Sequence, residues 1–400
     1  MAPLPAGAKL GSAKGRRETG GKGTEMPNNV RLAAAGLLVS GLVVLVAAPA
    51  TASDHHTWIV EPGTGTISAA VASASPGDTL QLEAGTFYDS VFVAQLDAQG
   101  NPEPKSVTIK GQGDETVIKP PAVTTNNPCN SPGSVEGICV SGQLDNQGNP
   151  VVTNPVHDVT ISDLRTTGFS DSGVIGFNTV GLEVKNVRSD HNGGYGIARF
   201  VSTHSLFQDN WTSFNGEAGL YMGDSPHGDS VATGNQSDHN GYGIFMRDST
   251  ELTATDNTVW GNCIGILAIN TGHGAPGDLP AGDYRIAEND VHANDAACPA
   301  NPGGGPATSG IGIALVAVHD TQVVDNSVND NKPTGPSIGS GGVVVLSNMA
   351  GAPTNNLVTH NSAERNQPAD IVSDGTGSGN KFGGNHCDIS LPASLDACSS

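Results

Sequence analysis

Charged and aromatic side chains are scarce in this chain of 400 residues. Only 14% of the residues are Asp, Glu, Lys or Arg, and only 4% are Phe, Trp or Tyr. Such values do not suit a helix-rich globule, whereas an apolar content of 36% is too high for a disordered chain. Glycine, by contrast, occurs 54 times. The composition therefore favours a repetitive, turn-rich architecture.

Basic side chains are outnumbered by acidic ones. The chain has 18 Lys and Arg against 39 Asp and Glu, a formal net charge of −21, and six of the 18 lie in residues 1–52. Nucleic acid and anionic membrane surfaces need clustered Lys and Arg, so we expect no nucleic-acid partner. A polyanionic substrate would need bridging cations or a local basic site. The acidity alone is also typical of a soluble extracellular surface.

An apolar run, Leu32–Val46, directly follows Arg31 near the N-terminus. A small-x-small pattern that ends at Ala52 comes after this run. We expect residues 26–52 to be a signal peptide cleaved near Ala52, so that the protein is secreted. The run is short for a membrane span, so we expect no integral span in the mature form. An uncleaved anchor is the alternative. Residues 1–25 are either an over-extended start or a long n-region.

All six cysteines follow residue 52. An even number in an oxidising compartment predicts disulfides, although six cysteines allow several connectivities. If near neighbours pair, the bonds are Cys129–Cys139, Cys263–Cys298 and Cys387–Cys398. None of these pairs has the C-x-x-C spacing of a zinc or redox site.

Short segments containing Asn and Gly recur along the chain. Their anchor residues Gly196, Gly219, Gly243 and Gly265 are separated by 23, 24 and 22 residues. Between the anchors, stretches such as Leu182-Glu183-Val184 have every second residue apolar, which indicates short strands. Three strands and three turns per repeat predict an all-β solenoid, a parallel β-helix in which equivalent strands pair from coil to coil.

The Asn of each segment has a structural role in this scheme. Equivalent turns place side-chain amides in register, where they can hydrogen-bond along the axis as Asn ladders do. We expect this ladder at Asn192, Asn215, Asn240, Asn262, Asn294, Asn331 and Asn361. The glycines that follow are expected to supply positive φ.

The open ends of a solenoid need covering. Ile67–Ala72 is expected to form a short N-terminal capping helix. The predicted organisation comprises residues 53–120 as the cap and first coils, residues 121–385 as the β-helix coils, and residues 386–400 as a C-terminal cap.

The chain resembles the pectate-lyase-like superfamily of right-handed parallel β-helices over roughly residues 57–385. The resemblance is carried by Pro76-Gly77-Asp78-Thr79-Leu80, by Ala84-Gly85-Thr86-Phe87-Tyr88, by Val107-Thr108-Ile109-Lys110-Gly111 and by the Gly-Ile and Asn repeats. It implies a right-handed, single-stranded β-helix. The superfamily includes polysaccharide lyases, hydrolases and epimerases, tailspikes, surface proteins and a helper of copper-enzyme maturation, so the fold alone does not name the function.

A polar column follows the anchor glycines. Asp224, Asp248 and Asn270 share one register, and Arg247 lies beside them; His204, His227, Glu251 and His273 come three places further on. Residues in register on adjacent coils are about 4.8 Å apart. The two aspartates could therefore share a calcium ion or divide acid and base roles. The candidate catalytic residues are Asp224, Arg247, Asp248, His227 and His273, and the candidate sugar-binding residues are Tyr221, Phe245 and Asn270.

The sequence leaves the type of reaction open. Arg247 or a histidine suits β-elimination or epimerisation, whereas paired carboxylates suit hydrolysis. Asp224-Ser225-Pro226-His227 is similar to the Asp-Pro-His element of alginate epimerases, with an added Ser. Gly272-His273-Gly274 matches one polygalacturonase element, but that family's other elements are missing. Stacked turns also align polar residues without any chemistry.

We therefore expect a secreted monomer that acts on or binds an extracellular polysaccharide, for which an acidic polymer is one candidate. If the protein is an enzyme, we expect a lyase, epimerase or hydrolase. A non-catalytic surface scaffold is the first alternative. A metal-delivery helper, suggested by the histidine column, is the second.

Overall fold

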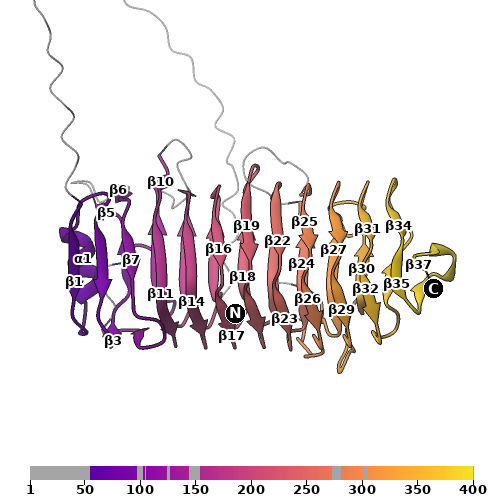
Figure 1. The fold of residues 1–400 in the computed structure, drawn as a ribbon, viewed down its shortest axis with the longest axis horizontal. Helices are drawn as coiled ribbons and strands as arrows, with labels where there is room; N and C mark the ends of the chain where they lie inside the picture. Colours follow the sequence, from indigo (N-terminus) through magenta and orange to yellow (C-terminus); the bar gives the residue numbers. More distant parts are fainter. Residues whose placement is uncertain are drawn as a thin grey trace, which may run out of the picture. The chain divides into compact units, whose positions relative to one another are not determined.

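Parallel strand pairing from coil to coil organises this protein (Figure 1). The computed structural model describes residues 55–96, 102–103, 105–123, 127–143, 154–272, 281–300 and 305–399. The predicted signal peptide and residues 1–25 lie outside the described residues. Within the described part, no helix has the length and apolar character needed to cross a membrane.

The strands form three columns, and each full coil contributes to all three. The first column consists of β1 (Thr57–Val60), β2 (Thr79–Leu82), β7 (Thr108–Lys110), the first halves of β11 (Thr160–Thr167) and β14 (Glu183–Asp190), β16 (Leu206–Gln208), β19 (Ser230–Thr233), β22 (Leu252–Thr255), β25 (Arg285–Ala287), β28 (Gln322–Val324), β31 (Leu357–Thr359) and β34 (Lys381–Gly383). The second column consists of β3 (Gly85–Tyr88), β8 (Thr116–Lys119), the second halves of β11 and β14, β17 (Trp211–Ser213), β20 (Gln236–Asp238), β23 (Thr258–Trp260), β26 (Asp290–His292), β29 (Ser327–Asn329), β32 (Ser362–Glu364), β35 (Asn385–Cys387) and β37 (Cys398–Ser399). The third column consists of β4 (Val91–Val93), β9 (Ile138–Ser141), β12 (Val174–Phe177), β15 (Ile197–Phe200), β18 (Ala218–Gly223), β21 (Tyr242–Arg247), β24 (Ile264–Ile269), β27 (Ile311–Val316), β30 (Gly341–Leu346), β33 (Ile371–Ser373) and β36 (Ser390–Leu391).

A few elements lie outside the three columns. They are the antiparallel pair β5 (Gln95–Leu96) and β6 (Pro102–Glu103), the parallel pair β10 (Val156–His157) and β13 (Thr179–Val180), the helix α1 (Thr66–Ser73) and the 3-10 turn η1 (Ala393–Leu395). Helix α1 lies at the N-terminal end of the stacked coils (Figure 1) and buries Ile67 and Val71 in the main core. This confirms the predicted capping helix.

The interior is filled by rows of identical or similar apolar side chains. In the third column, Ile197, Leu220, Ile244 and Ile266 pair in register, and all four are fully buried. Equivalent positions of successive coils thus stack their methyl groups directly on one another, which removes apolar surface from water along the whole axis. The predicted parallel solenoid is confirmed.

Two long asparagine ladders run through the turns of the described coils, one more than the sequence indicates. In each ladder the side-chain oxygen accepts hydrogen bonds from both the amide side chain and the backbone N–H of the preceding coil, as at Asn192, Asn215 and Asn240. The first ladder consists of Asn192, Asn215, Asn240, Asn262, Asn294, Asn331 and Asn366. The second consists of Asn210, Asn235, Asn257, Asn289, Asn326, Asn361 and Asn385.

Asn361 corrects the predicted ladder. It continues the second ladder, where it accepts from Asn326, whereas Asn366 follows Asn331 in the first. These coils are longer, with Asn294 and Asn331 separated by 37 residues in sequence. Spacing alone therefore could not decide between two asparagines that lie one short strand apart.

The anchor glycines serve close packing, which differs from the positive φ expected. A Cβ atom on Gly219 would lie 2.0 Å from the Ser237 hydroxyl oxygen and 2.9 Å from the Asn240 amide nitrogen. The positive-φ positions come earlier in the same turns, at His191, Phe214 and His239. The glycines therefore make room for the first asparagine ladder.

The three disulfides join Cys129 to Cys139, Cys263 to Cys298 and Cys387 to Cys398. This is the near-neighbour pairing predicted from the sequence. Parallel pairing continues beyond Cys387, because β36 pairs with β33 and β37 pairs with β35.

One arginine lies inside the solenoid. Arg199 is fully buried in the row that continues with Met222 and Met246. Its Nη1 donates to the Ser202 carbonyl at 3.0 Å and to the Ser225 hydroxyl, whereas Nε and Nη2 have no hydrogen-bond partner among the described residues. Burial lowers the pKa of Arg199 to about 10.

Replacing Asn240 by alanine should destabilise the fold by about 2 to 4 kcal/mol, because the backbone and side-chain donors of Asn215 lose their acceptor in a buried turn. Urea unfolding followed by circular dichroism measures this loss. Gln236→Ala removes an exposed amide from the same coil and should change the free energy of unfolding by less than about 0.5 kcal/mol. Equal effects of the two substitutions would contradict the structural role of the ladder.

Arg199→Met should raise the free energy of unfolding by about 1 to 3 kcal/mol, because methionine fills the row without leaving buried donors unpaired. Arg285→Met, at a side chain that is 45% exposed, serves as the control and should have little effect. A loss of stability in Arg199→Met would show that the guanidinium is compensated in the interior.

Candidate functional site

The outer face of the third column carries an aromatic and apolar cluster. Tyr221 is fully buried and Phe245 is 7% exposed. The Tyr221 ring stacks on Phe200 with centroids 4.5 Å apart and meets Phe245 edge-on at 5.2 Å. The expectation that Tyr221 and Phe245 present open faces to a sugar is therefore not met in this structure. Alternation could place these rings on the outer face but could not reveal how closely that face is packed.

Four residues at the C-terminal end of these strands form what we call the arginine cluster: Tyr221, Asp224, Arg247 and Asp248. The Tyr221 hydroxyl donates to Asp224 Oδ2 at 2.9 Å. Arg247 reaches both carboxylates, with Nη2 3.4 Å from Asp224 Oδ1 and Nε 3.1 Å from Asp248 Oδ2. The structure thus brings together three of the predicted catalytic residues, and it adds a phenol to them.

The two aspartates of the cluster differ in access. The Asp248 side chain is 1% exposed and accepts hydrogen bonds from the backbone N–H of Thr271 at 2.6 Å and from its hydroxyl. The side chains of Asp224 and Arg247 are 18% and 25% exposed. Asp248 therefore holds the guanidinium in place, whereas Asp224 and Arg247 can meet a ligand.

Burial raises the pKa of Asp224, and the positive charge of Arg247 offsets only part of that effect. For Arg247, burial alone would lower the pKa, but the surrounding Tyr221, Asp224 and Asp248 raise it. The guanidinium stays charged. Burial thus favours the protonated form of Asp224.

The remaining predicted residues lie outside this cluster. His227 is 73% exposed, and its Nδ1 lies 3.4 Å from Glu251 Oε1. The Asn270 side-chain oxygen accepts from the Gly272 backbone N–H at 2.8 Å, as in an ordinary turn. His273 lies outside the described residues.

The predicted calcium site at Asp224 and Asp248 does not fit the geometry, because Arg247 already bridges and neutralises the two carboxylates. In the part of the chain that the structure describes, another group offers three ligand atoms within 4.8 Å of one another: Asp283, His319 and Asp320. These residues lie in turns that follow the third column, where Gly282 and His319 bridge in parallel.

The opposite edge of the third column carries acidic and phenolic groups, which we call the acidic edge: Glu136, Asp171, Tyr195 and Glu217. The Tyr195 hydroxyl donates to Glu217 Oε1 at 2.8 Å. Glu136 is buried and accepts from the Ser172 backbone N–H at 2.8 Å.

Burial raises the pKa of Glu136 to about 8, with a further contribution from the charge of Asp171. Burial also raises the pKa of Glu217, against the lowering effects of the Tyr195 hydrogen bond and the Arg247 charge. Carboxyl groups with raised pKa values are typical of proton-transfer sites.

Sequence reasoning missed the acidic edge. Tyr195 directly precedes the anchor Gly196, whereas Glu217 lies two residues before the anchor Gly219, so both occupy variable positions of the recurring Asn-Gly segments. Polar residues at those positions in consecutive repeats were the available signal, but only the folded chain reveals their burial.

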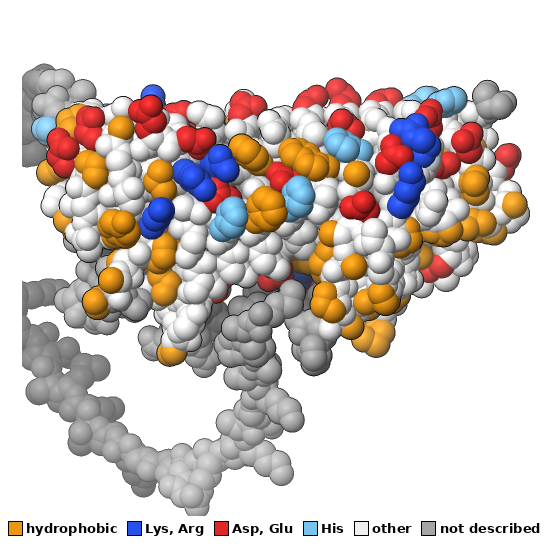
Figure 2. Space-filling view, turned by 90° about the horizontal axis from the view of Figure 1, so that it is seen from below, with side chains coloured by type: hydrophobic (Ala, Val, Ile, Leu, Met, Phe, Trp, Pro, Cys, Tyr) orange, Lys and Arg blue, Asp and Glu red, His pale blue; other side chains and the backbone are white. Residues whose placement is uncertain are grey.

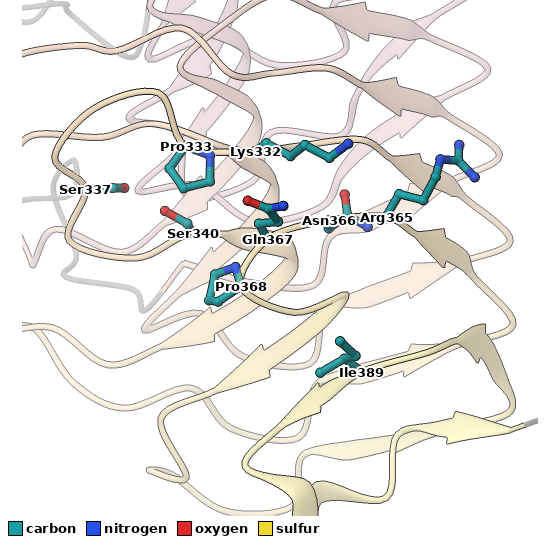
Figure 3. A pocket seen from close by; sticks show the side chains of 9 residues that line it. All are labelled: Lys332, Pro333, Ser337, Ser340, Arg365, Asn366, Gln367, Pro368 and Ile389. Atoms are coloured by element: carbon teal, nitrogen blue, oxygen red, sulfur yellow. The ribbon is translucent and has the colours of Figure 1, made fainter.

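A separate hollow of about 850 Å³ lies near the C-terminal end, between Pro333, Ser340 and Pro368 (Figure 3). Its two cationic residues, Lys332 and Arg365, pair with Asp330 at 3.0 and 2.8 Å, and Arg365 also pairs with Glu364 at 2.8 Å. Nearby carboxylates thus balance both positive charges, and these two residues give the hollow no excess positive charge.

Comparison with known proteins agrees with this architecture. A family model described as a right-handed β-helix region matches residues 144–276. The chain is a right-handed parallel β-helix protein. This confirms the fold expected from the resemblance, including its handedness.

Solved β-helix structures share the fold at low sequence identity. The A-module of mannuronan C-5 epimerase AlgE4 from Azotobacter vinelandii is 18% identical, with a TM-score of 0.50 over 84% of this chain and 100% of that one. A family 28 exopolygalacturonase from Yersinia enterocolitica is 12% identical, with a TM-score of 0.45 over 84% of this chain and 77% of that one. No curated protein sequence matches this β-helix.

Glu136 should make the stability of this β-helix depend on pH. Its pKa of about 8 in the folded state lies above its ordinary value of 4.5, so the folded state binds the proton more tightly. The contribution of Glu136 to the free energy of unfolding is therefore fully present below pH 4.5 and is lost as the pH rises to about 8. Glu136→Gln should remove this loss and be more stable than the wild type at pH 7, by about 3 kcal/mol.

Urea unfolding at pH values from 4 to 9 measures this dependence, with the exposed Glu61→Gln as the control. A wild-type slope that persists in Glu136→Gln would contradict the assignment.

Proposed function

We propose that this protein is secreted and acts on a uronic-acid polysaccharide at the outer face of the third column, by removing the proton at C5 of a uronate residue. The observation that carries the proposal is the arginine cluster: a phenol, an accessible carboxyl group and an arginine joined across two coils. The three disulfides suit an oxidising extracellular compartment.

The cluster contains the groups that this chemistry needs. A uronate C5 proton lies next to a carboxylate, and it becomes acidic when a fixed cation neutralises the developing negative charge. Arg247 is the partly exposed cation at this place. Asp224, which accepts a hydrogen bond from the buried Tyr221 hydroxyl, provides a proton acceptor close to that cation, and the acquired proton can pass to the oxygen that leaves C4.

Two outcomes follow proton removal. Loss of the substituent at C4 gives β-elimination, and return of a proton from the other side gives epimerisation. Hydrolysis is less well supported, because Asp248 is buried and fully engaged with Arg247 and Thr271, which leaves Asp224 without a second free carboxylate.

Two further facts agree with the proposal. The segment from Asp224 to His227 is similar to the Asp-Pro-His element of alginate epimerases, apart from the added Ser225. A solved structure that shares the fold is a mannuronan C-5 epimerase module.

Incubation with polymannuronate or polygalacturonate in D2O tests this proposal, because epimerisation replaces the C5 proton by deuterium, whereas elimination removes that proton and leaves a C4–C5 double bond. Arg247→Ala should slow the loss of the C5 proton about 10²- to 10³-fold through loss of charge stabilisation. Asp224→Asn should slow it about 10²-fold or more through loss of proton transfer. NMR spectroscopy of the polymer measures this loss.

Asp256→Asn is a matched control, since Asp256 is another turn aspartate with a φ of 56°, close to the 57° of Asp224. This variant should retain full activity. Retention of the C5 proton by the wild type on both polymers, or new reducing ends with neither deuterium at C5 nor a C4–C5 double bond, would refute the proposed chemistry.

A further inference from the structure

A second surface with a different charge pattern lies on the second column. Arg165 and Arg188 pair in register on β11 and β14, and both bind the carboxylate of Asp190. Arg165 donates through Nε and Nη2 at 2.8 Å, and Arg188 donates through Nε at 2.7 Å. The Asp190 side chain is fully buried beneath them, whereas the side chains of Arg165 and Arg188 are 29% and 27% exposed.

The charges on this surface do not cancel locally. The guanidinium groups of Arg165 and Arg188 share the one buried carboxylate of Asp190. A hollow of about 600 Å³ beside them is lined by Lys119, Arg165 and His191. Asp114, 3.6 Å from Arg188, is the other acidic partner, and it is 63% exposed. Around Arg165 and Arg188, three cations thus face two carboxylates, which contrasts with a chain of net charge −21. A further carboxylate, that of Asp238, lies two coils away, where it accepts from the Trp211 indole N–H at 2.7 Å and pairs with His239.

Aromatic side chains continue the surface on the next coils. Arg188 lies over the Trp211 ring, with its guanidinium carbon 4.2 Å from the ring centroid. Trp211 and Phe214 are 38% and 50% exposed. Phe214 stacks between His191 and His239, at centroid distances of 5.1 and 4.7 Å. Figure 2 views this side of the molecule and shows blue, pale-blue and orange side chains gathered on it.

The backbone conformation at Phe214 is unusual for an aromatic residue. Phe214 has a φ of 54°, a conformation that is unfavourable for a bulky side chain. Asn, Asp or Gly would be less strained there, and Asp or Gly does occupy equivalent turns elsewhere in the solenoid, as at Asp330 and Gly261. Local stability therefore does not explain an exposed phenylalanine at this position.

We propose that Lys119, Arg165, Arg188, Trp211, Phe214 and His191 form a binding surface for a carboxylated polysaccharide chain, the basic-aromatic face. Guanidinium groups pair with planar carboxylates, and aromatic rings stack on the apolar faces of sugars. Coils about 4.8 Å apart match the length of one pyranose residue, so successive uronates can meet successive coils. The face carries this role independently of the chemistry proposed for the arginine cluster.

Isothermal titration calorimetry with the full chain tests the proposal, using oligogalacturonates and neutral cello-oligosaccharides of equal length. The double variant Lys119→Gln, Arg188→Gln keeps the Arg165 to Asp190 pair and should weaken oligogalacturonate binding at least tenfold. Phe214→Asn keeps the charges and suits the left-handed backbone, and it should weaken binding about three- to tenfold. Wild-type binding should also weaken with added salt.

Arg285→Gln is the matched control, because it removes an exposed arginine from the first column, away from this face. It should bind like the wild type. Equal losses in Arg285→Gln and in the double variant, unchanged binding in the double variant, or no wild-type binding to oligogalacturonate would each overturn the proposal. Equally tight binding of dextran sulfate would overturn the preference for carboxylates.

The two proposed sites can fail separately. Asp224→Asn should slow the loss of the C5 proton and leave the affinity of the basic-aromatic face unchanged. A loss of affinity in Asp224→Asn would place the binding at the arginine cluster and contradict a separate face.

Discussion

The parallel register of the coils is the constraint on which the rest of the structure depends. A shift of one residue would turn every strand inside out, exposing the rows of Ile, Val and Leu. The two asparagine ladders oppose such a shift, because each side-chain oxygen receives two hydrogen bonds from the equivalent residue of the preceding coil. That register also sets the spacing of every polar row on the surface, including the arginine cluster and the basic-aromatic face.

The same register explains how much of the molecule could be predicted. Constant spacing of Gly196, Gly219 and Gly243 was sufficient for the fold, for most of the first ladder and for the alignment of Asp224 with Asp248. It failed at Asn361, because longer coils place two asparagines near the expected position. Disulfide partners followed from proximity in sequence, since each bond closes a turn or joins neighbouring coils.

Burial and pairing could not be predicted in the same way. Alternation says which side chains leave the interior, but it does not say whether the outer face is packed, as it is around Tyr221 and Phe245. The raised pKa values of Glu136 and Glu217 arise from that packing, and their positions in the sequence look like ordinary turns. The shared calcium ion was predicted from two aspartates in register, without the knowledge that Arg247 reaches both.

The two arginine sites differ in the ratio of cations to carboxylates, and this difference suits different tasks. Arg165 and Arg188 share the buried Asp190, so they retain positive charge for an anion from solution. Arg247 alone faces Asp224 and Asp248, so an incoming uronate adds a third negative charge. A carboxylate near Asp224 disfavours its ionised form, and burial already raises its pKa. On the proposed function, these effects make Asp224 a better acceptor for the C5 proton, while Arg247 pairs with the uronate carboxylate.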